Sequence, residues 1–404
     1  MESATSSDYA DRFRCIGPDC EDTCCQGWQI TLDHSALIQL QKLPDPALQS
    51  ILKNQLVPHP AGSPATQVAH FRLTDDHRCP CLRTDHLCSI QAQHGEQFLP
   101  LGCQLFPRVR NRIDQVLESS LSLACPEAAR LVLADPQLFR AFAHSPDDLL
   151  ASILNSIRAE AIVSNDPTPA AHFWPLRQLH LAILLDRTRS LNHRLILLGQ
   201  LARLMDKERS LRLILDGFRP LLRPLLRHQP ANADTTPAPA LLAFVFQSLD
   251  NALAANSQHT RLRDLVSGFL AAMQYTPLST EASLAARFRT LRNESLDPFL
   301  AQHPYLLENY FANQIIRDLY PFGTHSQSTP AYFRQFSNLL LQWTILRVVF
   351  AGLAGQHRSQ LTPNHLIAAT QTLARAILHN PLPSLQPAFL DLLQTLPLNA
   401  LLAL

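Results

Sequence analysis

The chain has 404 residues, of which 46% are hydrophobic, enough to build a sizeable core divided over two or three domains. Its 34 basic and 33 acidic side chains leave a net charge of only +1. This balance excludes the strongly basic surface that is typical of proteins that bind nucleic acids or anionic membranes. The first residues, MESATSSDYADRFRC, lack a basic segment followed by an apolar one, so we predict no export signal and expect a cytoplasmic location.

All the cysteines lie in the first third of the chain. They are Cys15, Cys20, Cys24, Cys25, Cys79, Cys81, Cys88, Cys103 and Cys125. Such confinement indicates a functional unit with its own chemistry. We therefore predict a cysteine-rich metal or iron–sulfur domain at residues 1–135 and an α-helical domain at residues 136–404, the latter subdivided near residues 228–240.

Short spacers within the first cysteine group favour ligands that converge on one metal centre, because closing such short loops costs little entropy. Two alternatives stay open. A disulfide framework would need an oxidising compartment and an even number of cysteines. Ordinary core cysteines would not explain why Cys24 and Cys25 are adjacent.

Ligand type alone does not separate zinc from an iron–sulfur cluster, since both bind four thiolates. No C-x2-C pair occurs in the chain, and this favours a [4Fe–4S] cluster over a zinc ribbon, with zinc as the alternative. The C-x3-C-x2-C pattern of radical enzymes is also missing, because Gly27 occupies its third position.

Beyond Cys125, apolar stretches of helical period alternate with proline-bearing breaks. Between Leu176 and Met205 apolar residues recur at close to 3.6 positions, which predicts one long helix or a helical pair. We predict breaks at Asn165–Pro169, His228–Pro239 and Pro321–Pro330. Alternating strand patterns are scarce and good helix formers dominate, so the fold class should be mainly α.

The most apolar stretch of the chain is Leu339–Gly355, which Gln342 and Arg347 interrupt. It is shorter than the roughly 20 apolar residues that a membrane-spanning helix requires. We therefore predict a buried helix and no association with a membrane.

Blocks of residues distributed along the chain resemble the flagellin lysine-N-methylase family. The blocks around the cysteines are Cys20–Asp33, Leu87–Ile90 with Gly95, Cys103–Arg108 and Cys125–Leu131. The later blocks are Leu184–Arg187, Arg194–Gly199, Glu308–Tyr310 with Asn313, Tyr320–Gly323, and Arg375 with His379–Asn380. The resemblance covers most of the chain in order, which chance does not explain.

The resemblance implies methyl transfer from S-adenosylmethionine to lysine ε-amino groups of flagellin, the protein of the bacterial flagellum, with an iron–sulfur cluster as cofactor. Where this chain has Cys81 the family commonly has an aromatic residue, so Cys81 is the cysteine least suited to be a ligand. The remaining candidate metal ligands are Cys15, Cys20, Cys24, Cys25, Cys79, Cys88, Cys103 and Cys125. The alternative function is a non-enzymatic iron–sulfur or zinc protein whose helical body binds a partner protein.

Methyl transfer to lysine requires the neutral amine, because the ammonium form, with a pKa of about 10.4, has no lone pair. Glu308, Asn309 and Tyr310 offer a carboxylate, an amide and a phenol in one segment, and they are the predicted catalytic residues. In the structural alternative, Glu308 pairs with Arg292 or Arg317 instead. The chain has no glycine-rich GxGxxG loop, so the position of the methyl-donor site is not predicted. The sequence does not predict the oligomeric state either.

Overall fold

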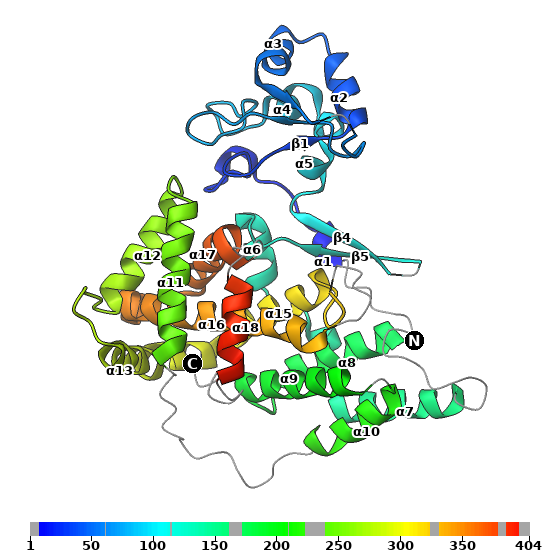
Figure 1. Cartoon of the computed structure of the whole chain (residues 1–404), viewed down its shortest axis with the longest axis vertical. Coiled ribbons are helices and arrows are strands. Elements are labelled where there is room, and N and C mark those ends of the chain that lie inside the picture. The colour runs from blue at the N-terminus through cyan, green and yellow to red at the C-terminus, as the bar shows by residue number, and fades with distance from the viewer. Residues whose placement is uncertain are drawn as a thin grey trace.

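The computed structural model describes residues 8–60, 62–113, 115–160, 172–208, 210–222, 239–323, 331–378 and 385–395. Within these residues the protein is mainly helical, as predicted, with a small N-terminal unit at the top of Figure 1 and a large helical body below it. Some predicted features lie outside the described residues: the break at Asn165–Pro169, most of the breaks at His228–Pro239 and Pro321–Pro330, the subdivision near residues 228–240, and the block His379–Asn380.

The small unit packs short helices around a three-stranded antiparallel sheet of order β1-β3-β2. Its strands are β1 (Thr31–Leu32), β2 (Leu56–Pro58) and β3 (Ala69–Phe71), and its helices are α2 (His34–Gln41), α3 (Pro46–Gln55), α4 (Ser89–His94) and α5 (Leu101–Leu105). In the central strand, Ala69 lies opposite Leu32 of β1 and Pro58 of β2. Aspartates start two of the helices: Asp33 and Asp45 accept hydrogen bonds from backbone N–H groups in the first turns of α2 and α3.

This unit has a hydrophobic core of its own, separate from that of the body. The buried members are Ile30, Leu32, Leu40, Leu48, Leu52, Phe71, Cys79, Cys81, Ile90 and Leu99. Two of the nine cysteines therefore lie inside this core, while the others are less enclosed or belong to a different part of the protein.

A β-hairpin and two short helices join the small unit to the body. They are β4 (Arg108–Ile113), β5 (Val116–Leu121), α1 (Asp8–Asp11) and α6 (Pro126–Leu133). The strands pair antiparallel with Arg108 opposite Leu121. The side-chain amide of Asn313 donates to the Leu121 carbonyl over 2.9 Å, and its oxygen accepts from the Tyr9 hydroxyl over 2.8 Å. These bonds fasten the hairpin and the start of the described chain to the same helix of the body.

The body consists of helices that follow one another through the rest of the chain. The first are α7 (Pro146–Glu160), α8 (Phe173–Leu185), α9 (Leu191–Lys207), α10 (Leu211–Leu222), α11 (Pro239–Ala255) and α12 (Thr260–Ala272). The later ones are α13 (Glu281–Leu291), α14 (Asp297–Gln302), α15 (Tyr305–Arg317), α16 (Tyr332–His357), α17 (Pro363–Leu373) and α18 (Leu385–Thr395). A π-helical turn, Ala374–Leu378, continues α17.

Helix α16 forms the centre of the body, and it contains the predicted buried helix Leu339–Gly355. Among the described residues this helix and its extension to Gln360 alone are long and apolar enough to span a membrane, but 94% of the apolar window is buried inside the protein. Close packing requires glycine here: a Cβ at Gly352 would lie 2.5 Å from the ring of Phe269. The prediction of a buried helix is confirmed.

The stretch Leu176–Met205 forms the helical pair α8 and α9, and the Ser190 hydroxyl starts the second helix by accepting the N–H of His193. The larger core of the body includes Tyr9 and the segment 121–133, which the predicted division at residue 135 assigns to the first domain. The boundary itself stays a prediction.

Candidate functional site

The cysteines gather where the small unit meets the body. The thiol of Cys25 is hydrogen-bonded to those of Cys24 and Cys88, and its carbonyl accepts the N–H of Cys79 over 2.8 Å. Cys103 lies near enough to Cys24, Cys79 and Cys88 for their thiolates to raise its pKa, in addition to the larger effect of burial. Three separate segments of the sequence therefore bring their cysteines together.

A second set of cysteines lies on the side of the body. Cys125 begins α6, and burial raises the pKa of its thiol to about 12, with Cys20 and Cys24 contributing in the same direction. Cys20 in turn lies near Cys15 and Cys24. Cys24 is therefore the residue that links the two sets.

Two of the thiols are held in an environment that favours the thiolate. The hydrogen bond from Cys25 lowers the pKa of Cys24, and the charge of Arg375 acts in the same direction. A hydrogen bond from Cys25 also lowers the pKa of Cys88 to about 6, together with backbone N–H groups at the start of α4. Correspondingly, the two neighbouring thiolates raise the pKa of Cys25. Thiolates in such surroundings are suitable ligands for soft metal ions.

No group of three or more His, Cys, Asp or Glu side chains among the described residues is placed to hold a metal ion, so metal binding by the small unit is not shown. A single zinc ion needs four donors at roughly 2.0–2.3 Å from one point. In an iron–sulfur cluster, by contrast, each thiolate can bind a different iron, so the ligands are spread more widely. The donor chemistry of these thiols suits zinc and an iron–sulfur cluster alike, so the cofactor stays a prediction. Cys81 is 1% exposed and is hydrogen-bonded to Cys79 and Ser89, and its low rank as a ligand stays a prediction.

Helix α17 and the π-helical turn that continues it fasten the first cysteine segment to the body. The guanidinium of Arg375 is ion-paired with Asp22 and donates to the carbonyls of Thr23 over 2.9 Å and Gln26 over 2.6 Å. One turn earlier, the side-chain amide of Gln371 donates to the Asp22 carboxylate over 2.7 Å. The side chains of Arg375 and Asp22 are only 15% and 10% exposed, so water screens this contact weakly. We call Asp22, Gln371 and Arg375 the clamp.

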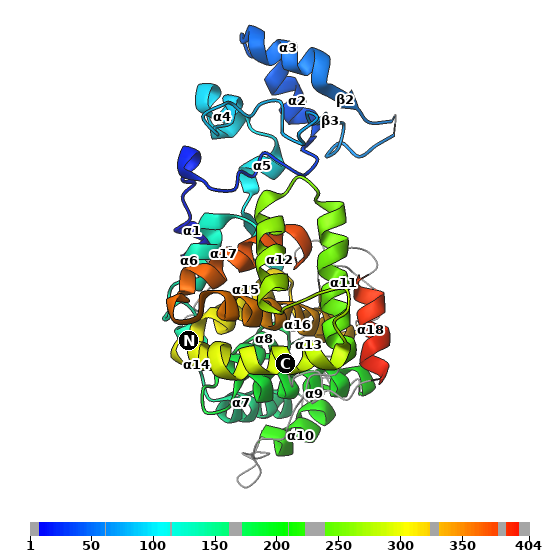
Figure 2. The ribbon, with the colours of Figure 1, turned by 90° about the vertical axis from the view of Figure 1, so that its left-hand side faces the viewer.

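Two ring side chains complete the surroundings of the clamp. His259, in the turn between α11 and α12, places its Nε2 atom 3.7 Å from the Asp22 carboxylate, and Figure 2 shows this turn directed at the small unit. Burial lowers the pKa of His259, which favours the neutral imidazole. The indole N–H of Trp28 donates to the carbonyl of Cys24, and its ring lies over Gly102, with Trp28 39% exposed.

Glu308, the predicted catalytic carboxylate, is buried in an ion-pair network and is 1% exposed. Its Oε2 atom accepts from Arg187 over 2.7 Å, and its Oε1 atom accepts from Arg194 over 2.9 Å. These partners differ from the two that the structural alternative named, since Arg317 lies beside Asp318 instead. Three separate blocks of the family resemblance therefore meet at this carboxylate.

Asn309 and Tyr310 point to other neighbours. The side-chain amide of Asn309 donates to the carbonyls of Val132 and Asp135, over 2.9 and 2.7 Å, at the end of α6. The hydroxyl of Tyr310 donates to Gln342 of α16 over 3.0 Å, and burial raises its pKa. The structure does not bring the three side chains into one pocket, and their catalytic role stays a prediction.

Sequence reasoning assigned no role to Asp22, Gln371 or His259, and it noted Arg375 only as part of a block. A signal existed for two of them. Asp22 is an acidic residue between the cysteines of the first group, and Gln371 precedes Arg375 by four residues, which places both on one helix face. His259 offered no comparable signal.

A sequence model described as the FliB lysine N-methylase C-terminal domain matches residues 177–401. Two proteins named lysine-N-methylase, from Salmonella typhimurium and Salmonella choleraesuis, are each 31% identical over 135 residues, or 33% of this chain and 33% of theirs. The chain therefore spans about a third of the length of these relatives. Flagellar biosynthetic protein FliU of Salmonella muenchen is 30% identical over 135 residues, 79% of its own length. No solved structure matches.

Proposed function

The chain belongs to the FliB lysine N-methylase family, and on this premise we propose that it transfers methyl groups from S-adenosylmethionine to lysine ε-amino groups of flagellin, in the cytoplasm before flagellin is exported. The family predicted from the sequence is confirmed. One observation carries the proposal. Helix α17 and the π-helical turn that continues it lie inside the region that the family model matches, and they hold the cysteine segment through Gln371 and Arg375, which supports a single site composed of both parts.

The proposed cofactor is a [4Fe–4S] cluster, with zinc as the alternative. The residues that would hold it come from the eight candidate cysteines, and among them Cys25 is hydrogen-bonded to both Cys24 and Cys88. The backbone N–H groups at the start of α4 support negative charge on Cys88. When bound, such a cluster supplies a redox-capable centre and cross-links the loops that carry its ligands.

The chain's own residues must bind the lysine, exclude water and favour its neutral form. Glu308, Asn309 and Tyr310 remain the proposed catalytic residues on chemical grounds, since a carboxylate, an amide and a phenol can each assist an amine nucleophile. Their contacts also support a second role, the fastening of α15 to α6, α9 and α16.

The second candidate function is a non-enzymatic metal protein whose helical body binds a partner. One observation favours it. The sheets in the described residues are short and antiparallel, so they offer no parallel-sheet edge of the kind at which doubly wound folds bind nucleotide cofactors. An enzyme with this fold must bind its methyl donor elsewhere.

The two candidates are separated by incubating anaerobically purified protein with S-adenosylmethionine and flagellin, followed by measurement of the intact mass of flagellin. The proposed enzyme adds increments of one methyl group that require the donor. Flagellin whose lysines have been acetylated serves as the matched control, because acetylation removes the nucleophile. Unchanged mass with a fully loaded protein would favour the non-enzymatic candidate.

A further inference from the structure

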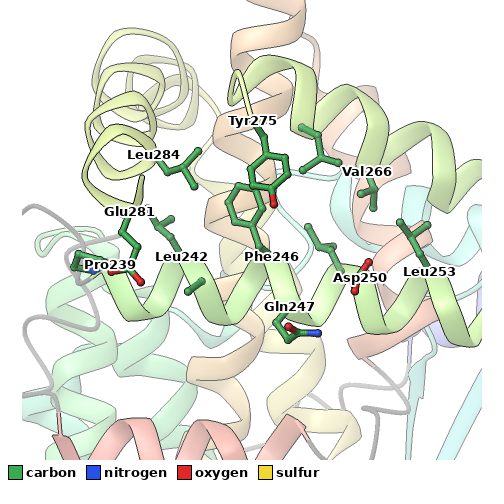
Figure 3. Close-up of a pocket in the computed structure, with 13 residues that line it drawn as sticks. Pro239, Leu242, Phe246, Gln247, Asp250, Leu253, Val266, Tyr275, Glu281 and Leu284 are labelled. Carbon is green, nitrogen blue, oxygen red and sulfur yellow. The ribbon is translucent and has the colours of Figure 1, made fainter. Parts of the chain in front are cut away.

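Helices α11, α12 and α13 enclose a groove of about 440 Å³, which Figure 3 shows in close-up. Its apolar wall consists of Leu242, Leu253, Val266, Leu270 and Leu284. In the middle of the groove the rings of Phe246 and Tyr275 lie 5.2 Å apart at an angle of 36°, and Tyr275 is 45% exposed. The groove thus combines an apolar wall with aromatic surface that solvent can reach.

The charge of the groove is purely acidic. Figure 3 shows Glu281 on one side of the aromatic pair and Asp250 on the other, and both side chains are exposed. Among the described residues that line the groove there is no lysine, arginine or histidine to neutralise these carboxylates. A cation in the groove is attracted by the carboxylate that lies at either end of it.

The groove lies on the same helical hairpin that reaches the cysteine segment. Residues of α11 and α12 form two of its walls, and the turn between these helices carries His259 to within 3.7 Å of Asp22. Figure 2 shows the two helices side by side, with their turn at the small unit. A chain that occupied the groove would therefore lie along the hairpin that leads to the cysteines.

We propose that this groove binds a lysine side chain of the protein substrate, an inference that rests on the proposed lysine-methyltransferase function. The four methylene groups of lysine suit the apolar wall and the aromatic rings, and the ammonium group suits a carboxylate at the end of the groove, Asp250 or Glu281. The groove is a docking site for a lysine other than the one being methylated, and it takes an extended, lysine-bearing segment. An acidic peptide or an anionic membrane surface would be repelled by the two carboxylates.

Fluorescence anisotropy with the full chain tests the groove without any need for turnover. The probe is a short fluorescein-labelled peptide that contains one lysine, and its partner carries norleucine, which keeps the four-carbon chain and lacks the charge. We expect the lysine peptide to bind about tenfold more tightly than the norleucine peptide. The double variant Asp250→Asn/Glu281→Gln should abolish this difference, whereas Asp264→Asn, an exposed carboxylate of α12 outside the groove, should preserve it. Equal affinities for both peptides, or an undiminished difference in the double variant, would overturn the proposal.

Methyl transfer to flagellin provides the second readout and keeps the two proposals apart. In the double variant KM for flagellin should rise about tenfold while kcat stays close to that of wild type, since docking is weakened and the reacting groups are untouched. If wild type transfers methyl groups and the double variant has an unchanged KM, the groove is not the docking site. If wild type transfers none, yet the lysine peptide binds through Asp250 and Glu281, the methyltransferase function falls and the binding site stands.

Discussion

Removal of the clamp's guanidinium is expected to free the first cysteine segment from the body. Arg375→Ala deletes three hydrogen bonds, one to the Asp22 carboxylate and one to each of the Thr23 and Gln26 carbonyls. Bonds that involve a charged group contribute about 1.5–3 kcal/mol each in isolation, but part of that loss is recovered when the freed groups reach water. Because Asp22 retains Gln371 as a donor, we expect the free energy of unfolding to fall by about 2–4 kcal/mol.

The assay is urea unfolding followed by circular dichroism, together with the rate at which a thiol reagent labels the cysteines of the metal-free protein. Arg375→Ala should lower the unfolding free energy and speed the labelling, because the segment that carries Cys20, Cys24 and Cys25 loses its anchor. Arg375→Lys keeps the charge but not the planar guanidinium that reaches several acceptors. Its unfolding free energy and its labelling rate should therefore lie between those of Arg375→Ala and wild type. The matched control is Arg334→Ala, which removes an exposed arginine of α16.

Equal unfolding free energies for Arg375→Ala and Arg334→Ala would refute the reasoning about the clamp. Reduced stability with an unchanged labelling rate would also contradict it, since the contact would then stabilise α17 without holding the cysteine segment.

The remaining predictions concern the buried carboxylate, the ligands and one histidine. Glu308→Gln should lower the free energy of unfolding by about 3 kcal/mol, because it leaves buried Arg194 without its counter-charge. A further loss of about 10²–10⁴-fold in activity per folded molecule would support a catalytic role. Full activity per folded molecule would show that Glu308 has a structural role alone. Cys24→Ser should reduce the iron content of anaerobically purified protein and Cys81→Ala should not, and the reverse result would contradict the ligand ranking. Burial lowers the pKa of His180 from 6.5 to about 4, so the unfolded chain binds a proton that the folded chain does not. Stability should therefore fall by up to about 3 kcal/mol as the pH drops from 6.5 towards 4, and His180→Phe should remove this part of the pH dependence in urea titrations.

Local periodicity predicted two of the helical stretches that the structure describes, because a helix depends on residues three and four positions apart. The repeat between Leu176 and Met205 gave α8 and α9, and Ser190 marks the break between them through its cap. The same reasoning identified α16 as a core helix, because Gln342 and Arg347 interrupt its apolar stretch. In the structure Arg347 lies against Asp297 and the face of Trp343 rather than in solvent.

The contacts of the candidate site could not be predicted in this way, since they join segments that are remote in sequence. Nothing near Asp22 indicates that Arg375 is its partner, and only the folded chain brings α17 against the cysteine segment. For the same reason the sequence named Arg292 and Arg317, both close to Glu308 in sequence, although its partners come from the α8–α9 region. Sequence proximity predicts pairs on one helix and gives no information on which helices pack together.

The cysteines show the opposite case, in which composition alone located the candidate site. Their confinement to one part of the chain indicated a common centre, and the structure brings Cys24, Cys25 and Cys88 into contact. The family resemblance ranked only Cys81 below the other cysteines. The sequence did not indicate burial, and the structure encloses both Cys79 and Cys81 in the small unit's core.

If the cysteine segment and the helical body form one lysine-methylating site, as we propose, loss of the contact between them should lower methyl transfer. The most direct measurement incubates wild type and Arg375→Ala with flagellin and a donor whose methyl group is deuterated, followed by peptide mass mapping of flagellin. We expect deuterated methyl groups on flagellin lysines with wild type and a much lower yield per folded molecule with Arg375→Ala. Flagellin without label, from wild-type protein that carries its full metal content, would contradict the proposed methyl transfer.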